Sequence, residues 1–130
     1  MLLPTTLCLT AAALLINFWL GMRCGRIRSK EKISVGDGGH DLLGRRMRAQ
    51  LNFAENTAWV LILIAGLELA GKGASWLALV GAIYMLGRVA HGLGMDGTGL
   101  KAGRGIGTVT TMLTQIGLAI VALLVATGYM

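Results

Sequence analysis

Four polar residues recur at helical spacing just before a long apolar stretch. Arg45, Arg48, Asn52 and Glu55 stand at i, i+3, i+7 and i+10, which places them on one stripe of a helix. Arginine side chains recognise carboxylates and phosphates through charge-assisted hydrogen bonds. The stripe is therefore a candidate binding site for an anionic ligand.

A second set of ionisable residues ends the next apolar stretch. Arg88 and His91 are i, i+3 neighbours, and Arg104 follows His91 by thirteen residues. An ionisable side chain within a membrane is costly unless it is paired or faces a cavity. Two interpretations stay open: Glu55 neutralises Arg88 while the other residues hydrate at the interface, or all of them line an arginine-rich pocket.

The elements that carry these residues are long and apolar. The chain has 130 residues and is 55% hydrophobic and 14% charged, whereas soluble domains carry about 25% charged residues. Residues 2–22, 57–71, 74–87 and 105–128 are free of charge except for Glu68. Since about 20 apolar residues cross a bilayer, four spans are expected. The first block lacks the basic leader of a signal peptide, so we expect it to be a membrane span that is not cleaved off.

We therefore expect an all-α fold, an integral membrane four-helix bundle in one domain over residues 1–130. The helices are predicted at about 4–23, 41–70, 74–93 and 104–128, with 24–40 as a basic loop. Helices rise about 1.5 Å per residue, so Glu55 lies about 24 Å from the far end of its helix. By the same rule Arg88 and His91 lie about 21 and 25 Å down theirs. All three fall in one leaflet or at its boundary.

The distribution of charge predicts an orientation. The net charge is +6, and eleven of the twelve lysines and arginines lie in 23–48 or 88–104. The positive-inside rule places these two loops in the cytoplasm and both termini on the other side. A membrane topology thus explains the basic charge without nucleic acid as a partner. Cys8 and Cys24 lie near opposite ends of the first block, so neither a disulfide nor a metal site is expected.

Several motifs resemble one membrane-protein family in order. The run Arg48-Ala49-Gln50-x-Asn52-x-x-Glu55 resembles the second-helix signature of the MAPEG family, membrane-associated proteins in eicosanoid and glutathione metabolism. Residues 87–91, with Arg88 and His91, resemble its third-helix segment, and Arg104 resembles the arginine that opens its fourth helix. Gly36-Asp37-Gly38 is similar to a loop of bacterial members, which implies a bacterial inner (plasma) membrane.

The resemblance implies a homotrimer that holds glutathione between neighbouring subunits near the cytoplasmic face. Arg48, Asn52 and Glu55 would bind the tripeptide, Arg88 would support the site, and Arg104 would hold the sulfur as a thiolate. The wider candidate binding set adds Gln50, Arg45 and His91. The implied activity is that of a glutathione transferase or peroxidase acting on lipophilic electrophiles that arrive from the bilayer, with membrane lipids as the surrounding partner.

Two alternatives remain. The family often has an aromatic residue and a proline where this chain has Asn56 and Ala58, and a serine or tyrosine where it has residues 105–107. Thr108 is the nearest hydroxyl, so a non-catalytic lipid- or thiol-binding protein is the main alternative. A transporter or channel subunit is less favoured, because Glu68 alone marks the opposite half of the membrane.

Other polar residues have expected structural roles. Asp41 is expected to cap the second helix, and Glu68 to snorkel or pair with Lys72. The basic run that opens with Arg23 is expected to anchor lipid headgroups. Hydrogen bonds between helices are expected from three residues: Thr111, Thr114 and Gln115.

Overall fold

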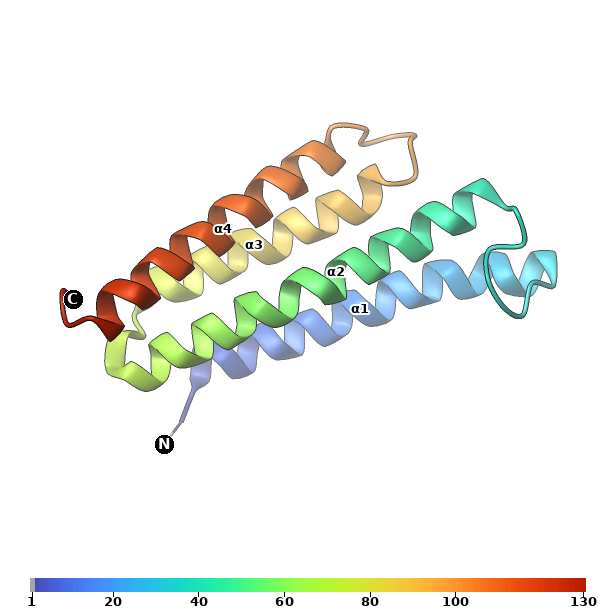
Figure 1. The fold of residues 1–130 in the computed structure, drawn as a ribbon. Coiled ribbons are helices and arrows are strands. Elements are labelled where there is room, and N and C mark those ends of the chain that lie inside the picture. The colour runs from blue at the N-terminus through green and yellow to red at the C-terminus, as the bar shows by residue number, and fades with distance from the viewer. Residues whose placement is uncertain (1) are drawn as a thin grey trace.

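The computed structural model describes residues 2–130 and has four long α-helices, α1 (Pro4–Glu31), α2 (Asp41–Leu67), α3 (Ser75–Gly94) and α4 (Gly103–Ala126). The helices lie side by side along one axis (Figure 1). Both termini and the turn between α2 and α3 lie at one end, here called the terminus end. The connections 32–40 and 95–102 lie at the other, here called the loop end.

Each helix is long and apolar enough to cross a membrane. Large apolar side chains on all four helices are exposed on the outside of the bundle, among them Leu15, Ile62, Leu86 and Leu113. In water such a surface would be unfavourable, but in a bilayer it contacts lipid. The all-α, four-helix membrane fold expected from hydropathy is confirmed.

The first helix is longer than its apolar block. It continues for eight residues past Arg23 and ends at Glu31, giving 28 residues or about 42 Å. The helix continues through these polar residues because arginine and lysine have high helix propensity. Lys32 then adopts a left-handed conformation at φ 55°, and its N–H donates to the carbonyl of Arg28. The predicted loop over 24–40 is wrong in its first half.

The ends of α2 also differ from expectation. His40, not Asp41, is the N-cap, and its Nδ1 accepts a hydrogen bond of 3.2 Å from the N–H of Leu43. At the other end the helix widens into a π-turn over Glu68–Lys72 and stops where Gly71 adopts a φ of 73°. Glycine adopts this φ without the steric cost that a Cβ brings, which explains why the helix breaks here.

Glycines let α3 and α4 approach until their backbones touch. A Cβ on Gly103 would lie 2.2 Å from the carbonyl oxygen of Ala90, and one on Gly107 would lie 2.3 Å from Cβ of His91. Small residues at such crossings are typical of helix packing in lipid. This contact fixes the start of α4 against the end of α3, where the candidate site residues stand.

Polar side chains join the helices inside the apolar region. Gln115 on α4 donates to Oδ1 of Asn56 on α2 at 3.0 Å, as expected for a bond between helices. The hydroxyls of Thr57 and Tyr84 lie 3.0 Å apart and are buried.

Glu68 does not pair with Lys72. Its carboxylate instead accepts hydrogen bonds of 2.9 Å from the backbone N–H groups of Thr5 and Thr6, and one of 2.8 Å from the hydroxyl of Thr6. Unpaired N–H groups at a helix N-terminus favour an anion, and this carboxylate supplies it. The contact ties the start of α1 to the end of α2.

Candidate functional site

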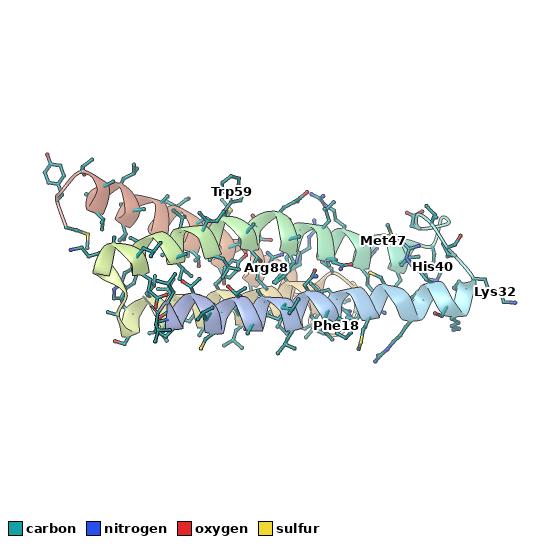
Figure 2. The ribbon with its side chains drawn as sticks, turned by 90° about the horizontal axis from the view of Figure 1, so that it is seen from below. Phe18, Lys32, His40, Met47, Trp59 and Arg88 are labelled. Carbon is teal, nitrogen blue, oxygen red and sulfur yellow. The ribbon has the colours of Figure 1, made fainter. Side chains whose placement is uncertain are left out.

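The guanidinium of Arg88 lies at the centre of the candidate site, and the residue is only 2% exposed. Figure 2 shows its side chain between the helices. It donates to Oδ1 of Asn52 on α2 at 2.6 Å and to the hydroxyl of Thr111 on α4 at 3.0 Å. Arg88 therefore joins three helices through neutral oxygens.

Arg88 has no carboxylate partner within the described residues 2–130, and its Nε is buried without a hydrogen bond. Glu55, which was one expected partner, lies instead 3.8 Å from Arg48 on its own helix. The interpretation in which Glu55 neutralises Arg88 is therefore wrong. Arg88 is a buried cation held by amide and hydroxyl dipoles.

His91 lies beside Arg88 and is buried. Its Nδ1 is 3.5 Å from Nη2 of Arg88, a long contact. Because a guanidinium can only donate, Nδ1 is the acceptor in this contact. His91 therefore supports the buried arginine and does not face the surface of the bundle.

The rest of the α2 stripe faces outward. The side chains of Arg48 and Glu55 are 58% and 48% exposed, and Asn52 between them is half-buried. A contact of 3.8 Å between exposed charges is weak, so both groups are free to bind other partners. The sequence stripe is confirmed as a row of neighbours, but it lies on the outside of the four-helix bundle.

Arg104 begins α4 and is exposed at a cavity of about 470 Å³. Arg45 and Lys101 also line this cavity, together with Gly94, Met95 and Gly97. A neighbouring cavity of about 420 Å³ shares two of these residues, Arg45 and Met95, and extends to Arg48. Arg104 thus lies at the loop end, near the start of the stripe at Arg45.

Gln50 lies on a different face of α2. Its Nε2 is 3.4 Å from Oδ1 of Asn17 on α1, and it lines a groove of about 610 Å³ between α1 and α2 with Cys24 and Arg28. Residues two apart on a helix do not face the same way. The fold of the single chain therefore does not bring Gln50 together with Arg48 and Asn52.

Sequence reasoning missed an ion cluster at the loop end. Asp96 accepts from Nη2 of Arg23 at 2.5 Å, and from Nε and Nη2 of Arg46 at 3.1 and 3.0 Å. Arg23 also donates to the carbonyl of Gly92 at 2.8 Å and lies over the ring of Trp19. Arg23 is therefore a buried internal contact, and its expected role as a headgroup anchor is wrong.

Asp96 is the only acidic residue after Glu68, which is the sequence signal that marks it. Burial raises the pKa of this carboxyl, but hydrogen bonds from Arg46 and the charges of Arg23 and Arg46 outweigh burial and hold the pKa below its ordinary value. The cluster connects α1 and α2 to the 95–102 loop. It thereby fixes Met95, which lines both loop-end cavities.

Comparison with known protein families identifies a match over most of the chain. The family model described as the MAPEG family matches residues 6–124, which includes every candidate site residue and all but the outermost residues of the four helices. No curated protein matches the chain closely enough to be reported as a relative. With four membrane-spanning helices and this match over most of its length, the chain is an integral membrane protein that belongs to the MAPEG family.

Proposed function

We propose that this protein is a membrane-bound glutathione transferase or peroxidase that uses the thiolate of glutathione against lipophilic electrophiles. One observation carries the proposal: an exposed row of Arg48, Asn52 and Glu55 leads, at the loop end, to a cavity lined by three cations. The side chains of Arg48, Glu55 and Arg104 form no ion pair shorter than 3.8 Å within residues 2–130, although they stand on helices that cross a bilayer. A polar ligand is the physical reason for such an arrangement.

The donor set fits glutathione. The tripeptide carries two carboxylates and one ammonium group, and the site offers several arginines and one free carboxylate, that of Glu55. When bound, glutathione supplies a thiol whose ordinary pKa is about 8.5 and which is nucleophilic as the thiolate. Arg104 keeps its charge at physiological pH and stands at the positive end of α4. We assign Arg104 the role of stabilising that thiolate.

The two faces of α2 favour a site shared between subunits. Arg48, Asn52 and Glu55 lie on one face, and Gln50 lies in the α1–α2 groove on another. A ligand that contacts both sets must lie between two copies of the chain. We therefore propose a homotrimer, as in the family, with glutathione between neighbouring subunits. Mass measurement of the detergent-solubilised protein tests this, and a monomer would rule out the shared site.

The orientation follows from charge. Eleven of the twelve lysines and arginines lie in 23–48 or 88–104, the two segments that contain the loop-end connections, and we propose that the loop end faces the cytoplasm of a bacterial inner membrane. Lipophilic substrates would then reach the site from the inner leaflet. Reporter fusions at Met130 test this orientation, and a cytoplasmic C-terminus would contradict it.

A second candidate function is binding of a thiol or lipid without catalysis. One observation favours it: the hydroxyl nearest Arg104, that of Thr108, donates at 2.8 Å to the carbonyl of Arg104 within the same helix. The hydroxyl of Thr110 is likewise bonded to the carbonyl of Ile106. Neither hydroxyl proton is free to stabilise a thiolate, so activation rests on the cations at the loop-end cavity, among which we assign the role to Arg104.

Ultraviolet absorbance of the thiolate, titrated against pH with glutathione bound, separates the two functions. The catalytic function predicts a thiol pKa about two units below normal, which corresponds to roughly 2.7 kcal/mol. Arg104→Ala should restore the ordinary pKa and abolish conjugation, and Arg104→Lys should retain part of both. Lys72→Ala, at the terminus end, is the control for loss of one positive charge. An ordinary thiol pKa in the wild type would mean that the protein binds glutathione without catalysis.

A further inference from the structure

The contact between Arg88 and Asn52 fixes which way the Asn52 amide points. The guanidinium carries five N–H donors and no acceptor. The atom of Asn52 that faces Nη2 of Arg88 at 2.6 Å must therefore be its oxygen, Oδ1. Arg88 is buried and its Nε already lacks a partner. Losing the bond to Asn52 would therefore leave its buried charge still less compensated. The amide is thus held in one orientation by a strong, charge-assisted bond.

The other end of the amide is free. Its nitrogen forms no hydrogen bond with any group in residues 2–130, and it is not among the enclosed unpaired atoms, of which Arg88 Nε is the one found there. The nitrogen is therefore accessible on the half-buried face of Asn52. It stands on α2 between Arg48 and Glu55, in the exposed row described above.

We propose that Arg88 is a positioning residue that makes Asn52 a hydrogen-bond donor to the ligand. This inference rests on the proposed function, because it concerns the same site. With Oδ1 bound to Arg88, Asn52 presents only its NH₂ group. The ligand atom that it contacts must be an acceptor, a carbonyl or carboxylate oxygen. The buried arginine thereby sets the polarity of the row: donors at Arg48 and Asn52, and an acceptor at Glu55.

The substitution Asn52→Asp distinguishes the role of the side-chain oxygen from that of the NH₂ group. Aspartate keeps an oxygen for Arg88 and adds a charge that neutralises the buried guanidinium, but it removes the NH₂ donor. The expected result has two parts: the thermal midpoint of the ligand-free protein is preserved or raised, and the Kd for glutathione rises at least about tenfold, which corresponds to about 1.4 kcal/mol. A destabilised ligand-free protein, or unchanged binding, would overturn the proposal.

A neutral variant separates the missing donor from repulsion between carboxylates. Asn52→Leu has nearly the same size and no donor, so it should weaken glutathione binding by a factor similar to that of Asn52→Asp. It should also lower the thermal midpoint, because Arg88 keeps Thr111 but loses the oxygen of Asn52. If Asn52→Leu binds like the wild type, the effect of Asn52→Asp is repulsion and the proposal is wrong. Asn52→Ala replaces it if the leucine variant does not fold.

Failure of this inference is distinguishable from failure of the proposed function. If the wild type does not bind glutathione in isothermal titration, the proposed function is wrong, and the orientation of the amide is then judged from the thermal midpoints alone. If the wild type binds and Asn52→Asp binds equally well, the function stands and the donor role is wrong. Arg88→Met adds a further readout: with the amide free to rotate, it should weaken binding less than Asn52→Leu does.

Discussion

Asp96 and Arg46 form a two-point contact, with Nε on Oδ1 and Nη2 on Oδ2 at 3.1 and 3.0 Å, between residues fifty positions apart in the chain. Paired contacts of this kind fix orientation as well as distance. They hold the 95–102 loop, and with it the approach to Arg104, against α2. The stability of the loop end should therefore depend on one carboxylate.

We predict that Asp96→Asn destabilises the protein by about 3–5 kcal/mol, because it leaves two partly buried arginines without a counter-charge. Unfolding by denaturant in detergent micelles measures the change. Asp41→Asn is the matched control, since Asp41 is 81% exposed and pairs with Arg45 one turn along the same helix. Such a pair contributes about 0.3–0.5 kcal/mol. Equal effects of the two substitutions would contradict the structural role of Asp96.

The same carboxyl predicts a dependence of stability on acid. Its pKa is lower in the folded protein than in the unfolded chain, where it is about 3.9. The stabilisation is then complete above the unfolded pKa and is lost as pH falls through the folded pKa. The difference in thermal midpoint between wild type and Asp96→Asn should be constant from pH 7 to about pH 5 and should narrow in more acidic buffer. A difference that narrows near neutral pH would require another titrating group.

Gly107→Ala should destabilise the α3–α4 pair. The added methyl group would lie 2.3 Å from Cβ of His91 and 2.5 Å from the carbonyl oxygen of Gly87, so the helices must separate. Overpacking of this kind costs about 1–3 kcal/mol. Gly117→Ala on the same helix is the control, since a Cβ there meets nothing within 4 Å. Thermal unfolding of both variants measures the change in stability. Lower stability of both variants would point to helix flexibility and not to the close contact.

Glu55→Gln should weaken glutathione binding about tenfold or more while changing stability by less than about 1 kcal/mol. The small change in stability follows from the exposed position of Glu55 and its long contact with Arg48. The loss of binding follows from the missing carboxylate partner for the ligand's ammonium group. Titration calorimetry and thermal unfolding measure the two effects, with Glu31→Gln as the control for charge. Unchanged affinity would remove Glu55 from the site.

The sequence predicts the spans well because hydropathy reports the membrane directly, and the four blocks reappear as four helices. It misplaces the end of α1, because the basic residues after Arg23 mark the edge of the bilayer and not the end of the helix. The stripe of Arg48, Asn52 and Glu55 follows from helical periodicity. That periodicity also separates Gln50 from them, although the family motif groups all four.

The partners of Arg23 and Arg88 could not be predicted from spacing. Arg23 meets Asp96 across 73 positions, and Arg88 meets Asn52 across 36, so both contacts depend on how the helices pack. Glu55 was the natural partner for Arg88 by charge alone. In the structure a neutral amide takes that place, which leaves the carboxylate available at the surface.

The uneven placement of charge along the bundle also affects how fast ligands arrive. At the loop end one carboxylate, that of Asp96, is shared by two arginines, and the nearby cavity adds Arg45, Lys101 and Arg104. The field of such an excess extends over about a Debye length, roughly 8 Å at physiological ionic strength. It steers anions toward that face before any contact forms. Association rates for anionic ligands should accordingly fall as salt is added, while those of neutral lipophilic molecules should not.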